Sequence, residues 1–121
     1  MSEAATTAGI GEFAVEAARL LADRHCTDVV LLDVREVSQV SNYVLVATGT
    51  SDRQMRSVAD EVADSGRDAG HAPFRSTRDR ASTWIVVDFV EVVVHLFEPN
   101  QRAYYDLESL WSDAPVVNWE R

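Results

Sequence analysis

Lysine is absent from this sequence, and all eleven basic residues are arginine. Twenty Asp and Glu residues outweigh them and give a formal net charge of −9 at pH 7. Proteins that bind free duplex nucleic acid usually carry a basic stripe, and none is visible here. A chain this acidic is instead attracted to basic protein partners, because complementary charges steer association.

Cysteine is almost absent as well, since Cys26 stands alone. A single cysteine excludes an intramolecular disulfide and leaves a thiolate metal site without ligands, so we interpret Cys26 as an inert, partly buried thiol. No apolar run approaches the ~20 residues that span a bilayer. Residues 1–5 lack the basic and apolar regions of a secretory signal. We therefore expect one ordinary domain in the cytoplasm, with 46% hydrophobic residues to build its core.

The hydrophobic pattern predicts a single α/β domain over residues 10–115, with a flexible tail on each side at 1–9 and 116–121. Apolar residues at helical spacing indicate an amphipathic helix that starts at Ile10 and another that runs from Ser51 towards Gly70. Pro99 suits the first turn of a last helix, which reaches Trp111. Strands are expected at residues 28–34, 43–47, 84–88 and 92–97, with a short edge strand starting near Phe74. This order of elements predicts a mixed β-sheet of about five strands flanked by helices.

Local signals fix the ends of the second helix. Ser51 and Gln54 fit a capping box, and Gly70 fits the residue that ends the helix. Gly66 lies inside it and should cost about 1 kcal/mol relative to Ala. The preceding turn, TGTS at residues 48–51, follows a strand, and its N–H groups could hold an anion. A lone glycine is neither a dinucleotide fingerprint nor a P-loop, so helix capping is the simpler explanation.

Catalytic residues are harder to find. Nucleotidyl transfer needs two or three carboxylates close enough to hold magnesium, and the candidates are Asp33, Asp88 and Glu91. The usual Asp-x-Asp pair on one strand is absent. A magnesium-dependent enzyme of the nucleotidyltransferase type, using Asp88 and Glu91, is the alternative to a binding protein. A third interpretation is a dimeric scaffold. His95 is read as a hydrogen-bonded structural residue or as a partner contact.

The strand at 84–88 suggests a binding surface. Alternation places Trp84, Val86 and Asp88 on one face of the sheet. The pattern predicts three good helices, and we expect that these do not cover both faces of four or five strands. An uncovered face that carries an aromatic residue beside acidic residues would bind a protein. Burial of Trp84 in the core is equally compatible with the pattern.

Several segments carry a family resemblance. They are DVR at 33–35, YVLVATGTSDRQ at 43–54, WIVVDF at 84–89, VVVHLF at 92–97, YDLE at 105–108 and LWSDAP at 110–115. In this order and spacing they resemble the Iojap-like ribosomal silencing factors, called RsfS in bacteria, over residues 10–115. Each motif is modest alone, and the ordered set is specific.

The resemblance implies a function that composition does not give. Members bind the large ribosomal subunit through its ribosomal protein fourteen and obstruct joining of the small subunit. Translation then falls when nutrients are scarce. The family fold is similar to that of nucleotidyltransferases without the catalytic carboxylates, so the resemblance implies a non-enzyme that needs no cofactor and no metal. Members are often homodimers when free.

Carried over to this chain, the resemblance implies a partner surface on the hairpin. Its residues would be Trp84 as the aromatic anchor, Val87 and Phe89 as apolar contacts, Asp88 and Glu91 facing basic groups, and Tyr43 and His95. Two positions depart from the family pattern, and at the first of them Phe89 stands where other members carry Tyr or Leu. Val90 stands where Gly is frequent, which suggests a different turn, since β-branched residues disfavour a positive φ. The Arg-rich loop 75–82 implies a local contact with ribosomal RNA.

Overall fold

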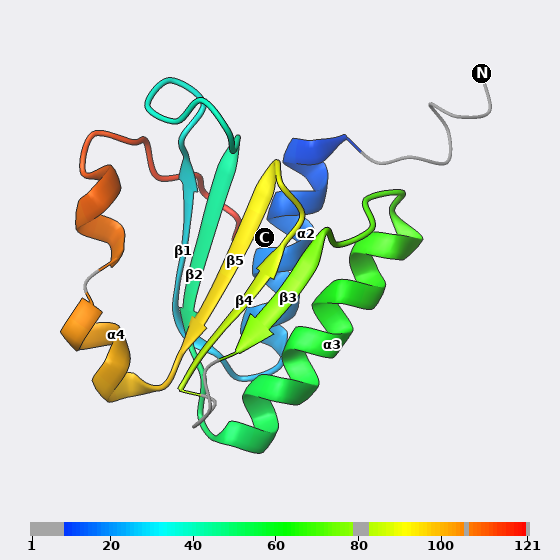
Figure 1. Cartoon of the computed structure of the whole chain (residues 1–121), viewed down its shortest axis with the longest axis vertical. Helices are drawn as coiled ribbons and strands as arrows, with labels where there is room; N and C mark the ends of the chain where they lie inside the picture. Colours follow the sequence, from blue (N-terminus) through cyan, green and yellow to red (C-terminus); the bar gives the residue numbers. More distant parts are fainter. Residues whose placement is uncertain (1–8, 79–82, 106, 121) are drawn as a thin grey trace.

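The computed structural model describes residues 9–78, 83–105 and 107–120. Its centre is a five-stranded sheet in the order β1-β2-β5-β4-β3 (Figure 1). Strands β2 and β5 are parallel, and the other neighbouring pairs are antiparallel. The strands are β1 (Thr27–Asp33), β2 (Tyr43–Thr48), β3 (Arg75–Arg78), β4 (Trp84–Asp88) and β5 (Val92–Phe97). The expected mixed sheet is therefore confirmed, including the short edge strand.

Two long helices pack on the same face of this sheet. Helix α2 (Ile10–Asp23) contacts β1 and β2, whereas α3 (Asp52–Asp68) contacts β4 and β5. Figure 1 shows α2 behind the strands and α3 to the right of β3, and the two helices contact each other. Within the described residues, none of the helices is long and apolar enough to span a bilayer.

Capping positions the start and the end of α3. The Ser51 side chain accepts a hydrogen bond from the Gln54 N–H at 3.0 Å, as the sequence predicted. The Gln54 side chain reaches back to the N–H of Thr50 rather than to that of Ser51. At the other end, Gly70 has a φ of 89°, which is the left-handed conformation that terminates helices.

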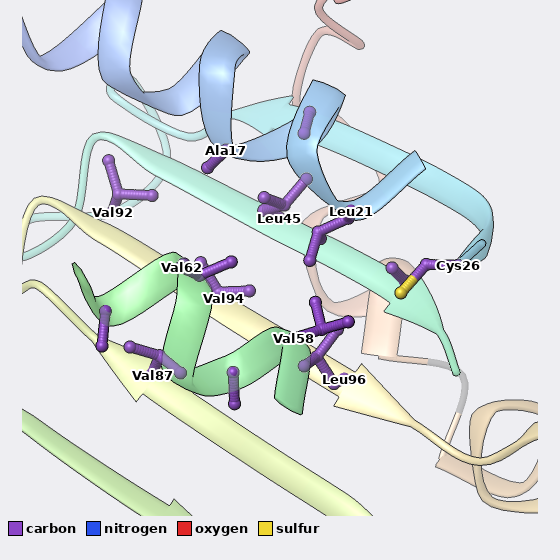
Figure 2. Packing of buried hydrophobic residues seen from close by; sticks show 14 of the residues in the cluster. Ala17, Leu21, Cys26, Leu45, Val58, Val62, Val87, Val92, Val94 and Leu96 are labelled. Atoms are coloured by element: carbon purple, nitrogen blue, oxygen red, sulfur yellow. The ribbon is translucent and has the colours of Figure 1, made fainter. Parts of the chain in front are cut away.

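The main core lies between the two helices and the sheet. Figure 2 shows Ala17 and Leu21 from α2 and Val58 and Val62 from α3, packed over strand residues such as Leu45. Cys26 lies at the edge of this cluster and is 6% exposed. Burial raises the pKa of its thiol, so it stays protonated at neutral pH, and its expected burial is confirmed.

The C-terminal segment departs from the prediction. The helix expected between Pro99 and Trp111 is divided into α4 (Pro99–Tyr105) and a short 3-10 helix, η1 (Leu107–Trp111). The expectation of a loose tail after this point is wrong for residues 116–120. Val116 forms a β-bridge with Leu32, and the Trp119 indole donates to the Val29 carbonyl at 3.1 Å. Hydrogen bonds between its main chain and the edge strand β1 hold this segment in place. The tail predicted at 1–9 lies, except for Gly9, outside the described residues.

Candidate protein-binding face of the sheet

The two faces of the sheet are covered unequally. Helices α2 and α3 take one face, whereas the described residues that pack on the other face come from α4, η1 and Ala114. Trp111 and Ala114 pack there over β1 and β2. Beyond them, side chains of β4 and β5 remain partly exposed. We call this region the open face, and it consists of Trp84, Val86, Asp88, Val93 and His95.

Strand register explains why these residues come together. In the antiparallel β4–β5 pair, Val86 lies opposite His95 and Asp88 lies opposite Val93. Residues directly opposite each other point to the same face. Trp84 lies opposite Phe97, so it is a diagonal neighbour of His95. The hairpin turn at 89–91 thus determines the composition of the open face.

Three rings form a cluster at one end of the open face. The Trp84 indole stacks on Phe97 with ring centroids 5.0 Å apart and planes 24° apart. Its Nε1–H donates to Nδ1 of His95 at 3.2 Å. The imidazole in turn lies parallel to the Phe97 ring, at 6.4 Å. Because Phe97 is fully buried, the cluster anchors the partly exposed indole to the core.

The hydrogen bond from Trp84 determines which ring nitrogen of His95 carries the proton. A neutral imidazole that accepts at Nδ1 carries its proton at Nε2. Burial lowers the pKa of His95 from 6.5 to about 4, and the negative charge of Asp88 opposes this effect only partly. His95 is therefore neutral at physiological pH.

Asp88 closes the other end of the open face. One carboxylate oxygen accepts from the Val90 N–H at 2.7 Å, and the other lies 3.5 Å from Arg75 Nε on β3. The Asp88 side chain is 20% exposed and that of Arg75 is 65% exposed. Glu91 follows in the turn and is exposed. Charges of both signs thus border an apolar centre.

The carboxylates proposed for magnesium do not form one cluster. Asp33 pairs in register with Tyr43, whereas Asp88 pairs with Val93, and the alternation of side chains places the two carboxylates on opposite faces. Strands β2 and β5 lie between them. Asp33 is bound by Arg35 at 2.6 Å, and this contact lowers the pKa of its carboxyl. Across the described part of the chain, no three His, Cys, Asp or Glu side chains are grouped to hold a metal ion.

Backbone N–H groups of the turn at residues 48–51 donate hydrogen bonds to other atoms of the protein. The Gly49 N–H donates to the Phe97 carbonyl at 2.8 Å, and that of Thr50 donates to Gln54 Oε1 at 3.0 Å. The Gln54 amide also donates to the Arg24 carbonyl at 2.8 Å. The N–H groups of Gly49 and Thr50 are therefore not available to bind a phosphate. Helix capping accounts for the conformation of this turn.

A family model described as "Ribosomal silencing factor during starvation" matches residues 7–121. The chain belongs to this family. A ribosomal silencing factor of Bacillus subtilis is 35% identical over 96 residues, which cover 79% of this chain and 81% of that protein. The chloroplastic Iojap protein of Zea mays is 30% identical, over 87% of this chain and 46% of its own length. A crystal structure of a Chromobacterium violaceum protein superposes with a TM-score of 0.81 at 33% identity, covering 87% of this chain and 88% of that one.

In this member of the family, the structure divides the residues predicted for the partner surface. Trp84, Asp88 and His95 lie on the open face, and Glu91 lies in the turn beside it. Trp84 is neither fully core nor fully exposed, because one side of its indole packs on Phe97.

Three of the predicted residues belong elsewhere. Val87 is 0% exposed and points into the core beneath α3. Phe89 is 6% exposed and packs edge-on against Phe13 at 4.9 Å. Neither is accessible to a partner, so both predictions are corrected: alternation turns Val87 away from Trp84, and the turn directs Phe89 towards α2. Tyr43 is partly exposed but lies on the helix side, next to Gly11.

Two residues of this region were missed by sequence reasoning. Val93 shares the open face with His95, as the alternation within VVVHLF already indicated. Arg75 reaches Asp88 from the neighbouring strand, and only the pairing of β3 with β4 places it there. Of the Arg-rich loop 75–82, residues 79–82 lie outside the described residues.

Proposed function

We propose that this protein silences ribosomes by docking its open face on the large subunit, through ribosomal protein fourteen of that subunit. An occupied subunit cannot accept the small subunit, so translation falls when nutrients are scarce. The site of action is the cytoplasm, where subunits join. The mechanism requires occupancy alone, and its extent depends on affinity and on concentration.

The uncovered half of the sheet carries this proposal. A partly exposed tryptophan, anchored on a buried ring, sits beside Val86 and Val93 on a rigid β-hairpin. Aromatic residues in such positions dominate the energetics of many protein interfaces. A rigid surface also lowers the entropy lost on binding.

Charge supports a basic partner. The formal net charge is −9, and Asp88 and Glu91 border the open face. Opposite charges across an interface raise the association rate and make that rate depend on salt. We therefore expect the on-rate to fall between low and moderate salt. An on-rate that does not change with salt would remove this electrostatic argument.

Cosedimentation tests the proposal directly. The purified protein is mixed with isolated large subunits, small subunits or joined ribosomes at two salt concentrations. The proposal expects retention on large subunits alone and fewer joined particles when small subunits are added afterwards. Lack of retention on large subunits at low salt would refute it.

A pair of charge reversals locates the surface. Glu91→Arg changes an exposed side chain beside the open face and should weaken retention by about tenfold. Asp64→Arg makes the same charge change on α3, where the Asp64 side chain is 74% exposed. Its exposed pair with Arg67 is worth under about 1 kcal/mol, so the fold should tolerate this control. Equal weakening in both variants would mean that net charge, and not the open face, governs binding.

We propose two further partner contacts, the first implied by the family resemblance and the second by the arginines of residues 75–82. In the free protein, we propose a homodimer, which sedimentation equilibrium at several concentrations would detect. For the bound protein, we propose that the Arg-rich segment 75–82, which begins with β3, contacts ribosomal RNA. Arg78→Gln, in the same strand but not opposite an open-face residue, should then weaken binding to intact large subunits while leaving binding to isolated ribosomal protein fourteen unchanged. Equal losses in the two assays would rule out the RNA contact.

A further inference from the structure

A hydrogen bond from its indole helps to hold the aromatic anchor of the open face. Trp84 Nε1 lies 3.2 Å from Nδ1 of His95, which is on the adjacent strand β5. The stacked Phe97 fixes the plane of the indole, with an angle of 24° between the two rings. Stacking is compatible with two orientations of the indole, which are related by a half-turn about its Cβ–Cγ bond. The hydrogen bond selects one of them.

This bond also decides what the indole presents to a partner. An indole N–H is a donor only, and a donor buried at an interface without an acceptor is costly. His95 satisfies that donor within the protein. The exposed part of Trp84 can then meet an apolar surface without loss of a hydrogen bond to water.

The neighbours of His95 leave this acceptor role available. Val86 and Val46 flank it in register on β4 and β2. Asp88 lies on the same face, but its carboxylate is engaged by the Val90 N–H and lies near Arg75. The imidazole is thus free to act as the acceptor for the indole.

We infer that His95 is a positioning residue for docking, which holds the Trp84 indole in the one orientation that a partner binds. This inference rests on the proposed function, because it concerns the same open face. It adds a role for a residue that does not itself need to contact the partner. Substitution of His95 should therefore change binding only when it removes the acceptor.

Two substitutions of His95 distinguish the effect of its hydrogen-bond acceptor from the effect of its imidazole ring. In His95→Asn, the side-chain oxygen can occupy nearly the position of Nδ1 and keep the hydrogen bond. In His95→Leu, an apolar side chain of similar size leaves the indole N–H without this acceptor. Val94→Ala serves as the control for stability, since Val94 is fully buried on the helix side of the same strand.

Two readouts are measured on all of these proteins. The first is the indole N–H signal of Trp84 in a ¹H–¹⁵N NMR spectrum, assigned by its disappearance in Trp84→Phe. The second is retention on isolated large subunits in cosedimentation. We expect His95→Leu to shift the Trp84 signal and to weaken retention by about tenfold, the effect of losing one hydrogen bond. His95→Asn should keep both the signal and the retention near wild type.

Each other outcome overturns the inference. Wild-type retention by His95→Leu would mean that the orientation of the indole does not matter for docking. Weak retention by His95→Asn with a normal indole signal would mean that the imidazole itself contacts the partner. A loss of the same size in Val94→Ala would trace the effect to lower stability. Failure of the wild-type protein to bind would instead refute the proposed function, which separates the two failures.

Discussion

Acid should destabilise this protein through His95, and one substitution should remove that effect. Burial lowers the pKa of His95 to about 4 in the folded protein. The unfolded chain restores a value near 6.5. Between these values the unfolded chain binds a proton that the folded protein does not, so the free energy of unfolding falls as the pH falls. The contribution is fully present above pH 6.5 and is lost progressively as the pH falls through 4.

The size of this loss follows from the two pKa values. Each unit of difference between the folded and unfolded pKa corresponds to about 1.4 kcal/mol. The complete loss in the free energy of unfolding is therefore about 3 kcal/mol. Applying the same linkage at pH 7 and at pH 5 gives a loss of about 2 kcal/mol over that interval. The interval stays above the sequence pI of about 4.6, where the net charge vanishes.

Urea denaturation at several pH values measures the effect. His95→Asn does not titrate in this range, so it provides the reference curve. Carboxylates such as Asp33, whose pKa the Arg35 side chain lowers, contribute to both proteins and cancel in the difference. We expect the wild-type protein to lose about 2 kcal/mol more than the variant between pH 7 and pH 5. Parallel curves would refute the conclusion that His95 is partly buried and neutral in the folded protein.

Three further substitutions test the fold around the site. Gly66→Ala should lower the free energy of unfolding in urea by about 2 kcal/mol, because a Cβ there would lie 2.6 Å from the His71 carbonyl oxygen; a gain from helix propensity would contradict this. Val90→Gly should raise stability by about 1 kcal/mol, and Tm by about 4 °C in calorimetry, because Val90 has a φ of 72°; a lower Tm would show that the turn is not strained. Arg102→Met removes a guanidinium that is 12% exposed and bonded to Glu108 at 2.6 Å. It should cost about 2 kcal/mol and speed amide hydrogen exchange in η1, and unchanged exchange would show that this ion pair does not hold the segment.

Much of the fold was predictable because its signals are local. The strands at 84–88 and 92–97 were placed to the residue, since each is a short apolar run and a three-residue turn separates them. The cap at Ser51 and the left-handed Gly70 were also predicted. Such features depend on backbone geometry within a few residues, and neighbours along the chain reveal them.

The turn at Val90 shows where a local rule was outweighed. A β-branched residue disfavours a positive φ, which suggested a different turn from that of relatives with Gly. The observed φ of 72° keeps the left-handed conformation. Asp88 accepts from the Val90 N–H, and the Phe89 N–H donates to the Val92 carbonyl at 2.9 Å, so the hairpin register imposes the conformation despite its cost.

The sequence by itself determined the elements, the acidic charge and the family resemblance, because each is encoded in the order and type of residues. Only the tertiary structure decided which side of the hairpin is accessible. Both of its faces are apolar, and the pairing of α2 and α3 on one of them buries Val87 while Trp84 stays partly exposed. Gly66 illustrates the same limit: its cost to the helix is local, but the reason for its small size is His71 and Phe89 packed against it. Contacts between distant segments set these properties, and no pattern within one segment records them.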